Sequence, residues 1–249
     1  MYNSSKIEQE FKRIKNLGFI KSNRQLNKDG GIGNTFEDYL GVAENNLKDP
    51  DFNGFEIKTQ RHFTSSYVTL FSKSPSYPKR ANSMLKDKYG EVRDVEKFPD
   101  LKKLYASIFG DKWSYVYEKY NMKLNVIEED QKVYLNVKEP GKDIFNEVYW
   151  SYDDLRKSVK KLEKLFIVFA TSKKIDESQY YHYNKGIVYL NFNFNNFISM
   201  IKTGFIQFDL RMGVYSSGKN YGKPHDHGSG FRVRKENMSN LYEETLYLD

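Results

Sequence analysis

The sequence contains no cysteine, and this absence removes several classes of chemistry at once. Disulfides, thiolate zinc sites, iron–sulfur clusters and cysteine nucleophiles are all excluded. Long apolar runs are also missing, because the longest uncharged stretch, residues 186–201, contains four asparagines and cannot cross a bilayer. The N-terminal residues are too charged for a signal peptide. We therefore expect a soluble protein, and its lack of cysteine is compatible with a reducing, cytoplasmic compartment.

The common catalytic fingerprints are absent as well. The chain has no Walker loop, GxSxG elbow, HExxH zinc motif or glycine fingerprint for dinucleotides. What it does have is a length of 249 residues with 39% hydrophobic and 16% aromatic residues, which is enough for a substantial buried core. The aromatic residues mostly follow strand or helix spacing, so core packing explains them better than stacking on single-stranded bases.

The formal net charge is +7, and the positive charge is unevenly distributed. Residues 202–235 hold seven basic residues and only two acidic ones, within a glycine-rich stretch. Such a local excess favours a polyanionic partner, whereas a solvated surface loop is the plain alternative.

Helical and strand patterns alternate along the whole chain. Residues 5–17 predict an amphipathic helix with Ile7, Phe11, Ile14 and Leu17 on one stripe. A glycine-rich turn at residues 29–33 precedes a short helix that we expect to begin near Thr35. Further helices are expected at residues 78–88, 151–162 and 194–203, and strands at 55–59, 67–71, 113–138, 165–170, 205–215 and 229–235. This interleaving predicts an α/β or mixed α+β fold.

The most informative segment is Pro50–Lys58. Asp51 precedes a strand, and a turn at Asn53-Gly54 can fold it back beside Glu56. Glu56 and Lys58 project from the same face of that strand. Two converging carboxylates make a site of hard oxygen ligands suited to Mg²⁺, and Lys58 can orient or deprotonate a water. The pattern predicts metal-assisted hydrolysis of a phosphodiester, against the alternative of a solvated strand face.

Glu37, on the short helix, is a candidate third carboxylate. Its alternative role is that of an ordinary acid in the first helical turn, where it interacts favourably with the helix dipole.

A second group of candidate residues lies in the basic region. Arginine binds guanine bidentately, aspartate accepts a hydrogen bond from cytosine, histidine binds guanine, and lysines suit phosphates. The residues proposed to contact DNA are Asp209, Arg211, Lys219, Lys223, His225, His227 and Arg232. A metal site made by His225, Asp226 and His227 is a weaker interpretation, because no further ligand is evident. A mobile basic loop is the other alternative.

Ordered blocks of the sequence resemble the MvaI/BcnI family of type II restriction endonucleases. The first two blocks are Gly31–Asp38 and Pro50–Thr59, which contain the acids and the lysine described above. The others are Leu70–Pro75, Ala81–Leu85, Tyr149–Ser151, Ser217–Lys219 and His225–Arg232. These blocks span most of the chain in a single order. The segment 91–120, both termini, Ser216 and Asn220-Tyr221 depart from the family pattern.

The resemblance implies a PD-(D/E)XK nuclease core with a mixed central sheet, related to the mismatch-repair nickase MutH. It implies two lobes that form a DNA-binding cleft. Residues 1–85, with core elements from 145–200, would form the catalytic lobe, and residues 86–144 and 201–249 the recognition lobe.

The resemblance also implies residue roles. Asp51, Glu56 and the main chain of Ile57 would hold Mg²⁺, which Mn²⁺ can replace; Lys58 would act on the attacking water, and Glu37 would be an additional active-site acid. The implied partner is double-stranded DNA, cut by a monomer one strand at a time at a pseudosymmetric CCWGG-like site in a prokaryotic cell. A cognate DNA methyltransferase would be its genetic companion. Two other functions stay open: a MutH-like nickase that depends on repair partners, and a non-catalytic DNA-binding protein.

Overall fold

The computed structural model describes residues 5–22, 30–42, 50–61, 67–94 and 96–249. The chain forms two compact units. Unit 1 comprises Met1–Ser65, Lys160–Asn193 and Ser239–Asp249, and unit 2 comprises Ser66–Val159 and Phe194–Met238. These units divide the chain differently from the expected lobes. Residues 66–85, 145–159 and 194–200 belong to unit 2, and residues 239–249 belong to unit 1.

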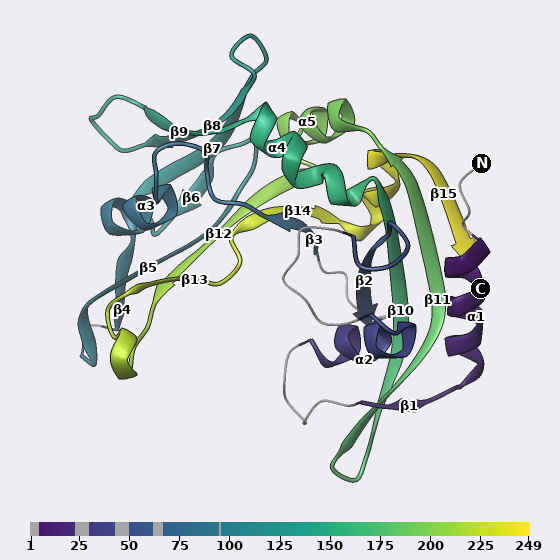
Figure 1. The fold of residues 1–249 in the computed structure, drawn as a ribbon. Coiled ribbons are helices and arrows are strands. Elements are labelled where there is room, and N and C mark those ends of the chain that lie inside the picture. The colour runs from purple at the N-terminus through teal and green to yellow at the C-terminus, as the bar shows by residue number, and fades with distance from the viewer. Residues whose placement is uncertain (1–4, 23–29, 43–49, 62–66, 95) are drawn as a thin grey trace. The chain divides into compact units, whose positions relative to one another are not determined.

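The described residues of unit 1 form a five-stranded mixed sheet (Figure 1). The long hairpin of β10 and β11 carries β2 on one side and β1 and β15 on the other. Its strands are β1 (Ile20–Lys21), β2 (Glu56–Arg61), β10 (Lys164–Ile175), β11 (Ser178–Phe192) and β15 (Tyr242–Leu248). Among the strands described in this unit, only the β10–β2 pair is parallel, with Leu165 beside Glu56 and Ile167 beside Lys58. The strands expected at 55–59 and 165–170 are therefore confirmed.

The core of unit 1 is built around β10. Every residue from Leu165 to Ala170 is at most 1% exposed, as expected for a strand covered on both faces. Phe166 lies on the face covered by α1 (Ser5–Asn16) and α2 (Gly31–Leu40), with its ring centroid 5.6 Å from that of Phe11 and 6.2 Å from that of Phe36. α2 thus packs next to β2, the strand that carries Glu56 and Lys58, and α1 packs against β11.

The first helix confirms most of its predicted stripe. Ile7, Phe11 and Ile14 are at most 1% exposed in α1. Leu17 is a correction: the helix ends at Asn16, and Leu17 is 51% exposed. The apolar repeat in the sequence therefore extends one residue beyond the end of the helix.

The second helix begins four residues earlier than expected, at Gly31 rather than Thr35. Gly30 is the N-cap with φ of 92°, so the change of direction occurs at this single residue. Gly33 lies within the helix. A Cβ there would be 3.2 Å from Thr59 Oγ1, so the glycine allows α2 to approach β2 closely. Thr35 is fully buried, and its hydroxyl donates to Ser22 Oγ at 3.3 Å. Thr35 therefore lies inside the helix, and the expected start near this residue is wrong.

Unit 2 contains two antiparallel sheets in its described residues. The six-stranded sheet has the order β3-β14-β12-β5-β4, with β13 paired to β12. Its strands are β3 (Tyr67–Ser72), β4 (Glu91–Asp94), β5 (Phe98–Ile108), β12 (Ile206–Val214), β13 (Pro224–Asp226) and β14 (Gly230–Arg234). The four-stranded sheet is a meander of β6 (Ser114–Val116), β7 (Tyr120–Ile127), β8 (Lys132–Lys138) and β9 (Phe145–Ser151). The strands expected at 67–71, 113–138, 205–215 and 229–235 are confirmed.

The two sheets of unit 2 share an aromatic core. Trp150 of β9 is fully buried, and its ring lies 4.5 Å from Phe208 of β12 and 5.4 Å from Phe231 of β14. The remaining helical segments of the chain are α3 (Ala81–Tyr89), α4 (Tyr152–Val159), α5 (Phe194–Lys202) and the 3₁₀ turns η1 (Lys160–Leu162), η2 (Gly218–Asn220) and η3 (Lys235–Leu241). Large aromatic side chains thus fix the strands that carry the basic region, and the expected helices at 78–88, 151–162 and 194–203 are present.

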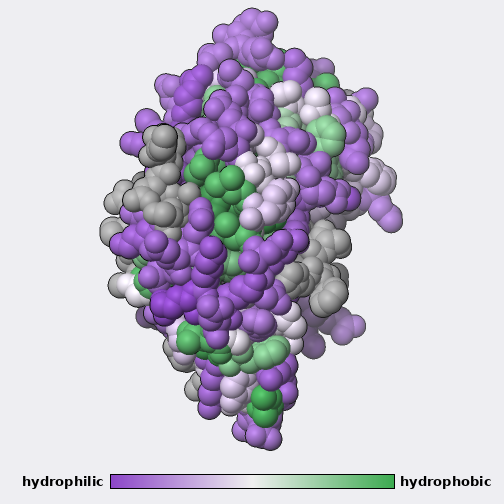
Figure 2. All heavy atoms as spheres, turned by 90° about the vertical axis from the view of Figure 1, so that its right-hand side faces the viewer, coloured by the Kyte–Doolittle hydropathy of each residue, from purple (hydrophilic) through white to green (hydrophobic). Residues whose placement is uncertain are grey.

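The face that carries α1 is largely hydrophilic. Figure 2, which looks onto the α1 side of unit 1, shows mainly hydrophilic residues with smaller hydrophobic areas. No helix among the described residues combines the length and apolarity needed to cross a membrane.

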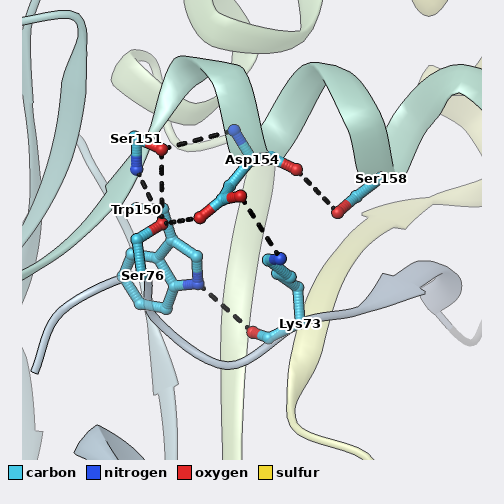
Figure 3. Close-up of polar contacts among 6 residues, drawn as sticks. All are labelled: Lys73, Ser76, Trp150, Ser151, Asp154 and Ser158. Atoms are coloured by element: carbon cyan, nitrogen blue, oxygen red, sulfur yellow. Dashed lines mark hydrogen bonds and ion pairs between the residues drawn. The ribbon is translucent and has the colours of Figure 1, made fainter. Parts of the chain in front are cut away.

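The start of α4 is joined to the segment after β3 by a serine that completes the helix cap (Figure 3). Ser151 Oγ accepts from the Asp154 amide at 3.3 Å, as an N-cap residue does. Ser76 Oγ accepts from the Ser151 amide at 3.0 Å and donates to Asp154 Oδ2 at 2.6 Å. The Ser76 hydroxyl therefore bridges the Ser151 amide and the Asp154 carboxylate, two groups that contact each other directly in a capping box. Trp150 Nε1 donates to Lys73 O at 3.2 Å and fixes the same segment.

Candidate active site and nucleic-acid interface

The Asp51 carboxylate is brought to the start of β2 by a tight turn. Asn53 and Gly54 both have positive φ, 48° and 81°, and Phe52 and Phe55 exchange backbone hydrogen bonds across the turn. Asn-Gly is favoured there because both residues tolerate this conformation. Asp51 Oδ2 accepts from the Ile57 amide at 2.8 Å. The predicted return of Asp51 to the strand that bears Glu56 is thus present.

Glu56 is a buried carboxylate contacted by two lysines. It is 5% exposed, and its Oε1 lies 3.2 Å from Lys58 Nζ and 2.8 Å from Lys161 Nζ. Lys58 shares its strand face, as the alternation predicts, while Phe55 and Ile57 enter the core. Lys161 comes from η1 and was not predicted. Its position follows from the parallel β10–β2 pairing, which brings the start of β10 beside the start of β2.

The pKa of the Asp51 carboxyl is raised at this site. Burial raises the pKa of Asp51, the Ile57 amide lowers it, and the negative charge of Glu56 raises it further. Lys161 and Lys58 act to lower that pKa. A partly buried carboxylate that is disfavoured in its charged form gains stability from a divalent ion. The oxygen donors of Asp51 and Glu56 therefore fit Mg²⁺ in kind.

Glu37 lies on α2, close to β2. A Cβ on Gly33 would be 3.8 Å from Glu37 Oε1 and 3.2 Å from Thr59 Oγ1, which places the Glu37 carboxylate at the contact of α2 with β2. Among the described residues, no three His, Asp or Glu side chains gather closely enough to hold a metal ion. The proposed role of Glu37 as an additional acid thus stays a prediction.

The basic region of unit 2 is held by a chain of hydrogen bonds centred on Asp226. Its carboxylate accepts from Asn82 Nδ2 at 2.9 Å and from the Ser229 amide at 2.6 Å. Ser229 Oγ in turn accepts from the Arg211 amide at 2.8 Å, and Arg211 O accepts from the His227 amide at 2.9 Å. Asp226 was considered only as a metal ligand, but its contacts are those of a residue that fixes the loop. Asn82, in one of the family-like blocks, is its buried partner.

Asp209 and Arg232 lie on neighbouring strands and pair with each other. Arg232 Nε is 3.2 Å from Asp209 Oδ2, without the angle of a hydrogen bond, and the side chains are 14% and 13% exposed. Burial lowers the pKa of Arg232, and the charge of Asp209 opposes that shift. Ser107 Oγ donates to Asp209 Oδ1 at 2.8 Å. Both residues were predicted to bind bases, but the sequence did not indicate this pairing.

A cavity of about 520 Å³ opens beside the histidines of β13 and the following loop. The rings of Tyr215 and His225 are stacked at 4.3 Å and 5°, and those of His225 and His227 are 4.1 Å apart. Burial and the nearby His225 lower the pKa of His227, so its neutral form is favoured. Arg93 and Lys103 also line the cavity. The walls thus combine flat rings with positive charge, which suits an anionic, aromatic ligand such as a nucleic acid.

The two predicted phosphate-binding lysines are exposed. Lys219 lies in η2, and Lys223 Nζ donates to Asn220 Oδ1 at 3.2 Å. Arg211 is exposed as well, in contrast to the half-buried Arg232. The region therefore presents exposed charges of Lys219, Lys223 and Arg211 around the more buried Arg232.

Comparison with known proteins supports a single family. Residues 8–242 match the model of the MvaI/BcnI restriction endonuclease family. A solved structure described as a complex of restriction endonuclease MvaI with its cognate DNA substrate has 32% sequence identity and a TM-score of 0.86, covering 100% of this chain and 99% of the other. MvaI in the absence of DNA has the same identity and coverage, with a TM-score of 0.64. No curated protein matches the chain.

Proposed function

Since the chain belongs to the MvaI/BcnI restriction endonuclease family and is a type II site-specific endonuclease with a PD-(D/E)XK-type fold, we propose that it hydrolyses double-stranded DNA with Mg²⁺ at a short pseudosymmetric, CCWGG-like site. It acts as a monomer and cuts the two strands in turn, in the cytoplasm of a prokaryotic cell that also makes a cognate methyltransferase. The observation that carries the catalytic part is the return of Asp51 onto the Ile57 amide, beside the buried Glu56.

Residues on β2 and just before it divide the catalytic work. Asp51, Glu56 and the main-chain carbonyl of Ile57 would hold Mg²⁺, or Mn²⁺ in its place. The bound ion would polarise the phosphate and supply a more acidic water. Lys58 orients the attacking water, since its ammonium is already held 3.2 Å from Glu56 Oε1. Glu37, on α2 where this helix contacts β2, is an additional acid. In-line attack leaves a 5′-phosphate on the product.

The readout of sequence is assigned to the basic region of unit 2. Arg211 and Arg232 bind guanines, Asp209 accepts from a cytosine, and His225 and His227 bind guanine edges. Lys219 and Lys223 contact phosphates and contribute affinity without sequence preference. Support comes from the DNA-bound relative, whose described ligand is its cognate substrate.

The test is digestion of a plasmid of known sequence with Mg²⁺, followed by sequencing of the fragment ends. Discrete fragments with 5′-phosphates are expected from the wild-type chain, and none from Asp51→Asn, whereas the exposed Asp100→Asn serves as the matched control. The sequenced ends give both the site and the cut position. Intact plasmid, or equal cutting by Asp51→Asn, contradicts the catalytic assignment. Nicking alone, stimulated by a repair protein, would indicate a MutH-like nickase instead.

A further inference from the structure

Lys161 contacts the proposed cation ligand more closely than the motif lysine does. Its Nζ is 2.8 Å from Glu56 Oε1, compared with 3.2 Å for Lys58. The contact joins residues 105 positions apart in sequence, and Lys161 is not part of the Pro50–Lys58 segment. A second lysine therefore stands at the carboxylate without any role in the mechanism described above.

The fold holds Lys161 in this position for reasons unrelated to its charge. Leu162, the next residue, is fully buried, and Leu165 pairs with Glu56 in the parallel register of β10 and β2. Core packing and strand pairing thus anchor the backbone immediately after the lysine. A lysine at this position reaches Glu56, whereas the neighbouring Lys160 is exposed to water.

The two lysines differ in how easily they can leave the carboxylate. The Lys161 side chain is 33% exposed and that of Lys58 is 20% exposed. Moving the ammonium of a side chain that is already one-third exposed into water costs less than moving that of a more buried one, because less structure has to rearrange. Both lysines share Oε1, so a cation that takes this oxygen competes first with the more exposed partner.

We propose that Lys161 is a positioning residue that holds the Glu56 carboxylate by its ion pair in the cation-free site, so that a divalent cation must displace it in order to bind. This inference rests on the proposed function of the Asp51–Glu56 site. Before the ion arrives, the positive charge of Lys161 offsets the repulsion between the Asp51 and Glu56 carboxylates. The same ion pair weakens the affinity of the site for the divalent cation.

The test measures binding of Mn²⁺ alone, without DNA, by the electron paramagnetic resonance signal of the free ion. Lys161→Met should bind Mn²⁺ about threefold to tenfold more tightly than the wild type, because no ion pair has to be broken. Lys161→Arg, which restores the pair, should return to the wild-type affinity. Lys160→Met is the matched control and should not change it. Thermal unfolding without Mn²⁺ should show a lower midpoint for Lys161→Met than for Lys160→Met.

Unchanged or weaker Mn²⁺ binding by Lys161→Met overturns the inference, as does an equal effect of Lys160→Met. Asp51→Asn separates this failure from failure of the proposed function. If the wild type binds Mn²⁺ and Asp51→Asn does not, the cation site stands even when Lys161 has no effect on it. If the wild type and Asp51→Asn bind Mn²⁺ alike, the cation site itself is wrongly placed and both proposals fall.

Discussion

Arg232 Nε lies 3.2 Å from Asp209 Oδ2, so a predicted guanine-binding residue is already paired with a predicted cytosine-binding residue. Each side chain is less than 15% exposed, and the two come from adjacent strands of one sheet. A guanidinium that is held before DNA arrives loses less conformational entropy on binding a base. Asp209 thus holds Arg232 in addition to its proposed contact with a base.

The pairing predicts coupled effects on specificity. Arg232→Ala should cost about 1–3 kcal/mol of discrimination at one base pair of the site. Asp209→Asn should reduce discrimination at the base pair read by Arg232 as well as at the one read by Asp209, because Arg232 is no longer held by charge. The measurement is kcat/KM on duplexes with single base-pair changes, and Arg234→Ala, an exposed arginine on β14, is the control. Strictly additive effects in the Asp209→Asn, Arg232→Ala double variant would contradict the coupling.

The exposed lysines of the basic region should contribute affinity rather than specificity. Lys219→Ala is expected to weaken binding to all duplexes alike and to reduce the salt dependence of log K by about one unit. Arg211→Ala should instead lower the preference for the cognate duplex. Fluorescence anisotropy over a range of salt concentrations, with cognate and scrambled duplexes and Ca²⁺ in place of Mg²⁺, distinguishes the two. A cleavage pattern and rate unchanged by Arg211→Ala would remove the main support for its role in readout.

The raised pKa of Asp51 predicts that the site costs stability when no cation is present. A carboxyl whose folded pKa is above its unfolded value destabilises the protein at pH values where it is ionised. Asp51→Asn removes that charge, and the amide oxygen can still accept from the Ile57 amide. Its unfolding midpoint in EDTA should therefore exceed that of the wild type at pH 7, while Mg²⁺ should raise the midpoint of the wild type only. A lower midpoint in EDTA would show that the carboxylate is stabilising instead.

The cap of α4 predicts a loss of stability in acid. The hydrogen bond from Ser76, and then Lys73, lower the pKa of Asp154 below its ordinary value of 3.8. The contribution is fully present above that unfolded value and is lost as pH falls through the lower folded value. At pH 7, Ser76→Ala should lower the free energy of unfolding by about 1 kcal/mol. The figure is modest because the Asp154 side chain is one-third exposed and is screened by water.

The control for that prediction is Ser158→Ala. Ser158 Oγ donates to the Asp154 carbonyl within the helix at 2.8 Å, a bond that adds little to helix stability. Urea unfolding at pH 7 and pH 3 gives the comparison. The cost of Ser76→Ala should shrink at pH 3, and a cost independent of pH would mean that the charge of Asp154 is not involved.

The elements that the sequence predicted are those whose signal is local. The Asn53-Gly54 turn, the alternation of β2 and the stripe of α1 each depend on residues close together in the chain. The start of α2 was misplaced because glycines usually indicate a turn, whereas here Gly33 allows the helix to approach Thr59. The strands β5, β11 and β15 were not predicted, since their patterns mix polar and apolar residues on both faces.

The candidate site was only partly predictable for the same reason. Asp51, Glu56 and Lys58 fall within eight residues, so their arrangement follows from one turn and one strand. Lys161 reaches Glu56 only through the parallel pairing of β10 with β2, which no local pattern specifies. The Asp209–Arg232 pair likewise depends on the register of β12 and β14, in which Gln207 pairs with Arg232 and Asp209 with Gly230.

Unit 1 is assembled from three separate stretches of the chain, and this sets the order in which the protein is completed on the ribosome. Unit 2 has all its residues once Met238 has been added, whereas β15, which pairs with β11, has yet to be synthesised. The sheet that carries Glu56 is therefore completed only after unit 2 has all its residues. Cleavage at the proposed site, which depends on that sheet, would then become possible only after the proposed DNA-reading unit has been synthesised.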